Sequence, residues 1–324
     1  MACRPVLFPV DHRPSLDIRM GGLIFTLRLQ SRRLALWAWF LLATAAIGCG
    51  KAAPRSPEQL RQVDDAGDTV ALVAPARRVV SLIPAATELL FGIGAGSSVV
   101  GRTQYCDYPP AALDVPNLGD GIKPSLEAVL AQRPDLVLLY NSGQNAAVAG
   151  RLREMGIPHA RINTDALSDV PRLSRMLGLL TGHLRGADSL AAVFDTALAQ
   201  ATVKPASRRP KVLLLVWEQP PMTVGRGSFL SELIERAGGE NVFSDVTASS
   251  GVVSIEAVAA RDPDMIFTTS EGPAAFASRP EWQVVPAVKR RRFLGVSGSE
   301  FERPSPRSPA AIRELANRLR EAGP

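Results

Sequence analysis

Cysteine and histidine are scarce in this chain, with three of each among 324 residues. The sequence has no Cys-x-x-Cys pair, no Cys/His spacing of the zinc-site kind and no His-Glu-x-x-His stretch. These absences argue against a structural zinc site, a zinc protease and a disulfide-stapled domain. They also leave Cys106 without a motif that supplies the general base a thiol nucleophile needs. We therefore expect no metal site and no resident cofactor.

Long apolar runs are also missing, which argues against a comfortable transmembrane helix of about 20 apolar residues. The uncharged run Leu34–Gly48 has 15 residues and follows Arg28, Arg32 and Arg33. A basic segment, a short apolar stretch and small residues at its end are typical of a secretory signal peptide. We predict that residues 1–48 form this signal peptide, with Met20 as an alternative start.

The residue that follows this leader is Cys49, preceded by Ala46-Ile47-Gly48. This ending resembles a bacterial lipobox, in which the cysteine becomes the first mature residue and carries lipid. An ordinary signal peptide or an N-terminal anchor with a chance cysteine is the alternative. Each reading places the rest of the chain outside the cytoplasm. We predict lipidation at Cys49 and a flexible tether over residues 49–62.

Excess positive charge is largely confined to the leader. The chain carries a net charge of +6, and residues 1–48 hold six arginines, no lysine and two aspartates. The leader therefore accounts for +4, and the remainder for about +2. Its basic residues form no run interleaved with aromatics, so the composition does not point to nucleic acid as a partner.

Short apolar runs alternate with amphipathic segments in the rest of the chain. The runs Leu136–Tyr140, Val212–Trp217 and Met265–Thr268 are continuous, as in strands that a parallel sheet buries on both faces. The alternation predicts an α/β architecture in two lobes, residues 63–167 and 205–324. Leucines at helical spacing, interrupted by glycines, predict a helical bridge over residues 168–204. We expect two helices there, the second the longer.

Two segments of the sequence match each other. Ser125–Val137 reads SLEAVLAQRPDLV and Ser254–Ile266 reads SIEAVAARDPDMI, identical at seven of thirteen positions and 129 residues apart. Each serine is suited to cap a helix, which places Glu127 and Glu256 in the first turn, free to point outward. One copy falls in each expected lobe, so the two glutamates form a matched pair of surface groups.

Four motifs in this order resemble a known family. They are Arg78–Leu90 (RVVSLIPAATELL), the loop Tyr105–Pro110 (YCDYPP), the two Ser-x-Glu units and Phe301–Arg307 (FERPSPR). The chain resembles the periplasmic vitamin-B12-binding proteins and the wider class of helical-backbone metal receptors of ABC importers. The resemblance implies two α/β lobes bridged by one long backbone helix, with the ligand in a cleft between the lobes, as in class III substrate-binding proteins.

The resemblance implies that aromatic side chains contact the ligand. Tyr105 falls on a tyrosine that packs against the corrin in the B12 protein, and Tyr140 and Trp217 fall on aromatic residues of the cleft. Such side chains offer large rigid surfaces with a polar tip. Tyr140 and Trp217 have a second interpretation as core aromatics at strand ends.

Other positions depart from the family pattern. Gly121 and Ser250 fall where the B12 protein has tryptophans, and Ser299 falls where it has an aspartate. Arg226, in VGRGS, is a candidate contact for an acidic or amide-rich ligand, or a solvated loop residue. We expect cobalamin or another corrinoid as the ligand, and these departures leave a haem or a ferric siderophore as the alternative.

The resemblance also implies the partners. The glutamates of the two Ser-x-Glu units, Glu127 and Glu256, match those that dock onto arginines of the ABC permease dimer. We expect an exported, monomeric binding lipoprotein, attached to the membrane through Cys49, that performs no chemistry. The remote alternative is an exported enzyme that uses Cys106 as its nucleophile.

Overall fold

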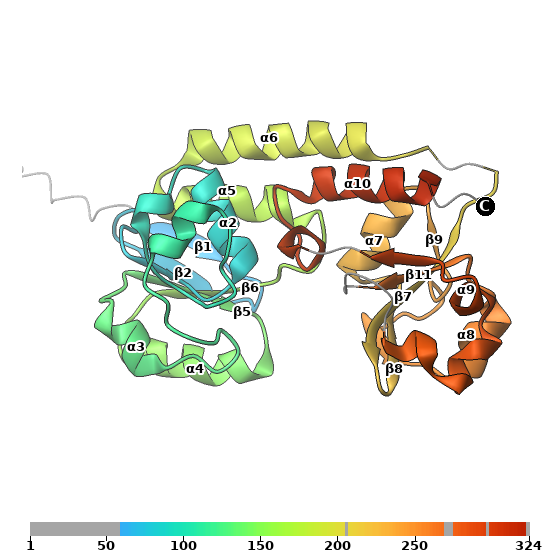
Figure 1. Cartoon of the computed structure of the whole chain (residues 1–324). Helices are drawn as coiled ribbons and strands as arrows, with labels where there is room; N and C mark the ends of the chain where they lie inside the picture. The colour runs from blue at the N-terminus through green and yellow to red at the C-terminus, as the bar shows by residue number, and fades with distance from the viewer. Residues whose placement is uncertain (1–58, 205–206, 269–274, 296–297, 322–324) are drawn as a thin grey trace, which may run out of the picture. The chain divides into compact units, whose positions relative to one another are not determined.

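The computed structural model describes residues 59–204, 207–268, 275–295 and 298–321 (Figure 1). The predicted signal peptide, Cys49 and tether residues 49–58 lie outside these ranges. No helix within the ranges combines the length and the apolar character that crossing a bilayer requires.

The N-terminal lobe is built on a four-stranded parallel sheet with strand order β4-β3-β5-β6. Its helices are connections between these strands, as the alternating sequence pattern predicts. The elements of the lobe after the first hairpin are β3 (Val79–Ser81), α2 (Pro84–Gly92), η2 (Gly96–Ser98), β4 (Val99–Arg102), η3 (Pro110–Asp114), α3 (Leu126–Ala131), β5 (Leu136–Tyr140), α4 (Gly143–Glu154) and β6 (His159–Ile162).

A separate antiparallel hairpin precedes this sheet. Strands β1 (Leu60–Val63) and β2 (Thr69–Leu72) pair around a turn in which the Asp64 carboxylate accepts hydrogen bonds from the backbone N–H groups of Ala66 and Asp68. The sequence Asp64–Asp68 (DDAGD) is typical of such a turn. Strand β1 begins at Leu60, so residues 60–62 belong to the hairpin and not to the expected tether.

The C-terminal lobe contains a mixed six-stranded sheet. Its strand order is β10-β8-β7-β11-β12, with β9 paired to the start of β7. Strands β7, β11 and β12 are parallel, whereas β8 and β10 extend the sheet in antiparallel fashion. The elements are β7 (Lys211–Glu218), β8 (Pro221–Val224), α7 (Phe229–Arg236), β9 (Glu240–Asn241), β10 (Ser250–Val252), α8 (Ile255–Arg261), β11 (Met265–Thr268), η4 (Ala275–Ser278), η5 (Pro280–Val284), α9 (Pro286–Lys289), β12 (Phe293–Gly295), η6 (Ser299–Phe301) and α10 (Ser308–Glu321).

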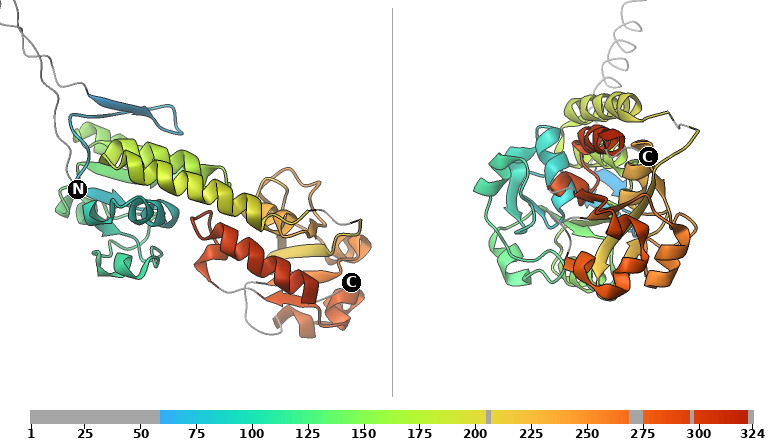
Figure 2. Two further views of the ribbon diagram at one scale, coloured as in Figure 1. Left: turned by 90° about the horizontal axis from the view of Figure 1, so that it is seen from above. Right: turned by 45° about the vertical axis from the view of Figure 1, so that its right-hand side comes forward.

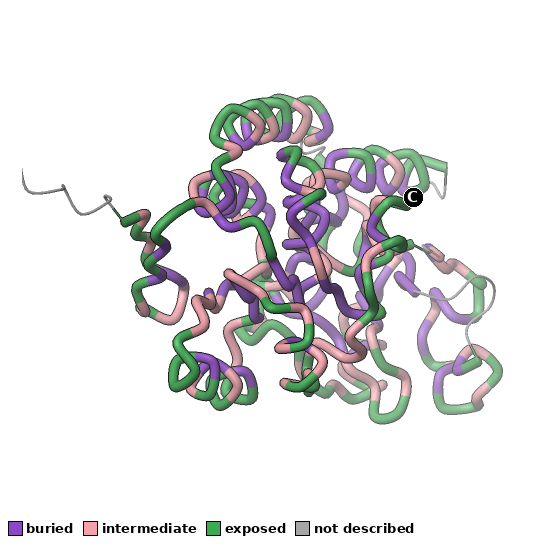
Figure 3. Tube along the Cα trace, turned by 90° about the vertical axis from the view of Figure 1, so that its left-hand side faces the viewer, coloured by how far each residue is buried: buried purple, intermediate pink, exposed green. Residues whose placement is uncertain are grey.

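The central strands of both sheets are buried on both faces. Along β5, Leu136 and Leu138 belong to one hydrophobic cluster and Val137 and Leu139 to another, so alternate side chains enter separate packed layers. Strand β7 repeats this arrangement in the other lobe. Figure 3 shows buried residues concentrated in the interior and exposed residues along the outer helices. The continuous apolar runs therefore reflect double-sided burial.

Two antiparallel helices occupy the predicted bridge. They are α5 (Asp169–Thr181) and the longer α6 (Leu184–Ala201), which lie side by side in Figures 1 and 2. Gly182 ends α5 with φ of 76°, a left-handed conformation that glycine adopts without strain. Helix α6 also contacts α10, so one helix packs against elements of both lobes. The expectation of two helices is confirmed.

Candidate functional site

The two matched glutamates occupy equivalent positions on short helices. Ser125 caps α3 by accepting a hydrogen bond from the Ala128 N–H (3.3 Å), and Ser254 caps α8 in the same way from Ala257 (3.1 Å). Each glutamate is the second residue of its helix and exposed. Neither carboxylate forms a hydrogen bond or ion pair with the described residues, so both are available to an outside partner.

A cavity of about 410 Å³ lies at the carboxyl ends of the strands in the N-terminal sheet. Such an edge is where open α/β sheets place their ligands, because the connections that leave the strands diverge there. The wall is mainly apolar, with a few amide and hydroxyl groups. The lining residues are Leu82, Ile83, Pro84, Thr103, Tyr105, Asp120, Gly121, Ile122, Tyr140, Ser142, Gln144, Asn145 and Thr164.

Three of the residues predicted to contact ligand, Tyr105, Gly121 and Tyr140, line this cavity together. Tyr105 follows β4 and is 54% exposed. Tyr140 ends β5 and donates a hydrogen bond from its phenol to Asp165 Oδ1 at 2.7 Å. Burial and the adjacent Asp165 raise the pKa of Tyr140 to about 12, since both disfavour the phenolate. Tyr140 is thus held in one orientation as a neutral donor.

Gly121 lies where no side chain fits. A Cβ at this position would stand 2.4 Å from the carbonyl oxygen of Leu82. A bulky side chain at this position would therefore require the loop to move. The next residue, Ile122, is 59% exposed and supplies apolar surface to the same cavity. Ile122 was not among the predicted contacts. Its position next to Gly121, in a loop at the strand ends, is the signal that could have identified it.

The C-terminal lobe has its own hollow of about 490 Å³, at the carboxyl ends of β7 and β11. Trp217 is 62% exposed here and donates a hydrogen bond from Nε1 to the Gln219 carbonyl at 2.8 Å, which fixes its ring. Its exposure excludes the alternative of a core aromatic. The lining residues are Leu215, Val216, Trp217, Glu218, Gln219, Thr268, Phe276 and Arg279.

The remaining predicted contacts lie outside both linings. Ser250 starts the edge strand β10, opposite Val224, and the loop after β8 brings Arg226 nearby through a backbone bond to Val246. Arg226 is exposed. Ser299 begins η6, where its hydroxyl accepts a hydrogen bond from Arg307 Nη2 at 3.0 Å. These three assignments stay predictions.

Cys106 is buried within the N-terminal lobe. Its thiol lies 3.2 Å from the hydroxyl oxygens of both Thr87 and Thr103. These contacts are with neutral hydroxyls, so they supply no general base. Among the described residues, no group of three histidine, cysteine, aspartate or glutamate side chains is arranged to hold a metal ion.

The linings carry little free charge. Among the described residues that line the N-terminal cavity, Asp120 is the one carboxylate and none is cationic. In the C-terminal hollow, Arg279 is paired with Glu218 at 3.7 Å. The N-terminal wall, mostly apolar with scattered amides and hydroxyls, and the more polar C-terminal hollow suit a large ligand whose periphery is neutral and able to form hydrogen bonds.

Comparison with known proteins gives a consistent result. A family model described as periplasmic binding protein matches residues 79–297. The chain is 28% identical over 250 residues to the vitamin B12-binding protein of Vibrio cholerae, covering 76% of this chain and 91% of that protein. It is 29% identical over 309 residues to an uncharacterised ABC transporter substrate-binding lipoprotein of Bacillus subtilis, covering 90% and 98%.

Solved structures agree on the fold. The crystal structure of the periplasmic vitamin B12-binding protein of Vibrio cholerae aligns with a TM-score of 0.64 at 26% identity, covering 76% of this chain and 98% of that one. The periplasmic heme-binding protein of Roseiflexus sp. RS-1 aligns with a TM-score of 0.69 at 24% identity, covering 76% and 99%. These are solute-binding proteins, which confirms the expectation of a binding protein rather than an enzyme.

Proposed function

Because this chain belongs to the periplasmic binding protein family, whose members deliver small molecules to ABC permeases, we propose that it captures cobalamin or a related corrinoid for an ABC importer. The protein is an extracytoplasmic receptor in this proposal, anchored by lipid at Cys49. It binds its ligand without changing it.

One observation carries the ligand assignment. Each lobe presents exposed aromatic surface at the carboxyl edge of its sheet: Tyr105 and Tyr140 in one lobe, and Trp217 in the other. A macrocycle has two broad faces, and flat aromatic side chains complement such faces with little loss of conformational freedom. Two lobes of this kind suit a ligand held between them.

The charge of the linings favours a corrinoid over a haem. A corrin ring carries neutral carboxamide side chains, whereas a haem carries two carboxylates. The part of the N-terminal lining that the structure describes has no cationic side chain, and Arg279 in the C-terminal hollow is paired with Glu218. A carboxylate taken out of water is best stabilised by a cationic partner, and the described lining residues offer no cation that is not already paired.

Delivery to the permease is assigned to Glu127 and Glu256. Both are exposed and lack a partner among the described residues, and both stand at the same position of matching helices. A pair of arginine-bearing permease subunits would meet two equivalent carboxylates. The relative in Bacillus subtilis named a substrate-binding lipoprotein supports the anchor.

A titration of the purified protein tests this proposal. Cyanocobalamin, cobinamide, haemin and a ferric hydroxamate siderophore are added in turn, and heat release and absorption spectra are followed. Submicromolar binding of a corrinoid, with at least a tenfold preference over haemin, is expected. Binding of haemin or the siderophore alone would reassign the ligand, and turnover of a thioester or peptide would overturn the receptor function.

A further inference from the structure

Helix α2 is buried along most of its length, yet it contains a carboxylate. Six of its nine residues are buried, and the Glu88 side chain is only 1% exposed. An isolated buried carboxylate is so unfavourable that it persists only when charged and hydrogen-bonded partners surround it. Glu88 therefore needs partners, and they come from the far end of the sequence.

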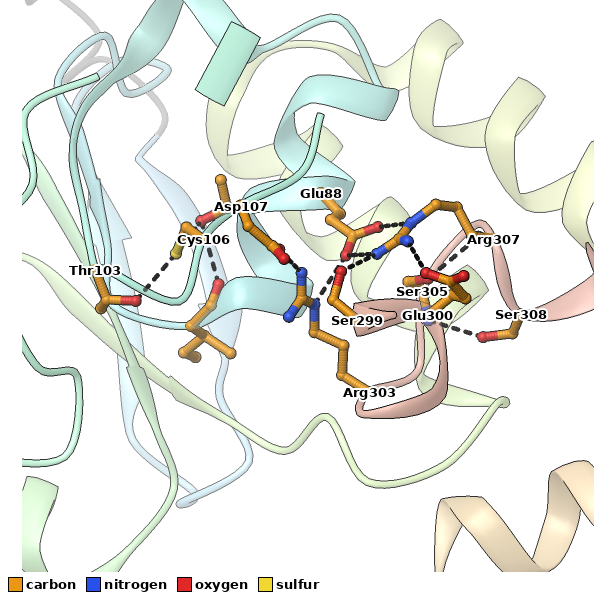
Figure 4. Close-up of polar contacts among 12 residues, drawn as sticks. Glu88, Thr103, Cys106, Asp107, Ser299, Glu300, Arg303, Ser305, Arg307 and Ser308 are labelled. Atoms are coloured by element: carbon orange, nitrogen blue, oxygen red, sulfur yellow. Dashed lines mark hydrogen bonds and ion pairs between the residues drawn. The ribbon is translucent and has the colours of Figure 1, made fainter. Parts of the chain in front are cut away.

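Two arginines of the segment before α10 bind both carboxylate oxygens of Glu88. Arg303 donates from Nε to Oε1 at 2.8 Å. Arg307 donates from Nη2 to Oε1 at 2.7 Å and from Nε to Oε2 at 2.9 Å. Figure 4 shows the two guanidinium groups on either side of this carboxylate. We call Glu88, Arg303, Arg307, Asp107 and Glu300 the Glu88 network.

Arg303 also reaches the loop that carries Tyr105. Its Nη2 donates to Asp107 Oδ1, two residues after Tyr105 and one before Tyr108. Burial alone would raise the pKa of Asp107, but the hydrogen bond and charge of Arg303 outweigh burial and hold that pKa below its usual value. Asp107 is thus a stable anchor, tying the loop to the C-terminal segment.

Arg307 reaches the second predicted contact element. It donates from Nη2 to the Ser299 hydroxyl at 3.0 Å and from Nη1 to Glu300 Oε2 at 2.6 Å. Its guanidinium carbon lies 4.1 Å above the centre of the Tyr108 ring, a cation–π contact. The network holds three carboxylates and two guanidinium groups, so neither arginine is left over for an anionic ligand.

We propose that Glu88 is a positioning residue of the ligand site. It does not line the cavity itself, but it orients two arginines. Arg303 holds the Tyr105 loop of the N-terminal lobe, and Arg307 holds Ser299 of the C-terminal segment. The assignment rests on the proposed corrinoid site, since it explains how contact elements far apart in sequence are fixed against each other.

Fluorine NMR of the ligand-free protein gives the sharpest test, because the chain has only three tyrosines. All three are replaced by 3-fluorotyrosine, and the resonances are assigned with single tyrosine-to-phenylalanine variants. In Glu88→Gln, the Tyr105 and Tyr108 resonances are expected to shift and broaden. The Tyr140 resonance is expected to stay, since Asp165 holds that side chain. An unchanged Tyr105 resonance in a folded Glu88→Gln variant would overturn the proposal.

Affinity for cyanocobalamin provides the functional readout. Glu88→Gln is expected to raise Kd at least tenfold, with no change in the absorption spectrum of the bound ligand. A Kd within twofold of wild type would show that the network only supports the fold, which would contradict the proposal. Should the wild-type protein bind no corrinoid, the proposed function fails, while the fluorine spectra still decide whether Glu88 positions Tyr105.

A milder variant keeps the test decisive if Glu88→Gln does not fold. Asp107→Asn breaks the exposed end of the network and leaves Glu88 paired with both arginines. A three- to tenfold rise in Kd and a shifted Tyr105 resonance are expected. The matched control is Asp68→Asn, a partly exposed aspartate of the same lobe that pairs with Arg153 and Arg161. Equal effects of the two variants on Kd and on the Tyr105 resonance would contradict the proposal.

Discussion

The two lobes are alike on one surface and unlike on another. Around the Ser-x-Glu units, the N-terminal and C-terminal lobes share a serine cap, a glutamate at the second helical position and a following buried parallel strand. At the carboxyl edges of the sheets they differ. One lobe offers two tyrosines and an isoleucine around a cavity without cations, and the other offers a single tryptophan beside an ion pair.

This difference follows from what each surface is proposed to meet. A permease made of two equivalent subunits presents the same group twice, so matched glutamates complement it. A macrocyclic ligand has two unlike faces and an uneven periphery, so the walls that hold it need not match. The surface on which the two lobes are alike is thus the proposed docking surface, and the surface on which they differ is the proposed ligand surface.

The largest expected effect comes from breaking the matched pair. Reversing both charges, Glu127→Arg with Glu256→Arg, should abolish uptake because arginine would repel the arginines proposed on the permease. Ligand affinity should stay within twofold of wild type. Uptake of radiolabelled cyanocobalamin by cells, together with titration of the purified variant, measures both quantities.

The matched control for this pair reverses Glu154 and Glu240, which are also exposed, one in each lobe. Uptake should remain near wild type in that control. A loss of ligand affinity in the Glu127 and Glu256 variant would show that these glutamates do not act in docking alone.

Next in size is the loss of an aromatic wall. Trp217→Ala should raise the Kd for corrinoid at least tenfold, because an indole ring buries roughly 150–250 Å² when covered by ligand. At ~25 cal/mol per Å² this area is more than enough for the effect. Val193→Ala on α6, where the side chain is similarly exposed, is the control and should leave Kd unchanged. Equal affinities of Trp217→Ala and wild type would remove Trp217 from the site.

A third comparison concerns Gly121 and Ser250, the two positions that the resemblance aligns with tryptophans. Gly121→Ala should destabilise the protein by about 1–3 kcal/mol, because the new Cβ would clash with the Leu82 carbonyl. Ser250→Ala, at an exposed strand end, should change stability by less than ~0.5 kcal/mol. Urea unfolding measures both. If Gly121→Ala is as stable as the wild-type protein, the loop shifts easily and the position can accept a larger side chain.

The smallest effect is spectroscopic. Because the pKa of Tyr140 is raised to about 12, its native-state interactions favour the protonated phenol. Their stabilising contribution is complete below about pH 10, the value of an unperturbed tyrosine, and is lost as pH rises through 12. Absorbance at about 295 nm, the tyrosinate band, should show a titration step near pH 12 that is lost in Tyr140→Phe. Asp165→Asn should move that step to lower pH, and an unmoved step would exclude Asp165 as a cause.

Much of the fold was predictable from local sequence. The serine caps, the apolar strands and the glycine that ends α5 each depend on residues near in sequence, and each was confirmed. The antiparallel extension by β8 and β10 was not predicted, because their short segments lack a clear period-two pattern. Their pairing depends on neighbouring strands.

The site was only partly predictable, and for a different reason. The aromatic candidates were found through the family resemblance, and their positions at strand ends bring them to the carboxyl edges of the sheets. The Glu88 network joins residues 215 and 219 positions apart, and no local pattern marks such a pair. Glu88 in RVVSLIPAATELL looks like an ordinary helix glutamate until its burial is known. The steric constraint on Gly121 likewise could not be predicted without the position of the Leu82 carbonyl.

The hydrophobic core bears on the independence of the two similar halves. One cluster runs from Val70 in the first hairpin through α5 and α6 to Leu319 in α10. The last segment of the chain also returns to supply both counterions of Glu88. A fragment that ended before the C-terminal lobe would expose the apolar face of α6. It would also leave the buried Glu88 carboxylate without its two arginine partners. The two lobes share a similar thirteen-residue segment, but their common core and the Glu88 ion pairs mean that neither is expected to fold as a separate unit.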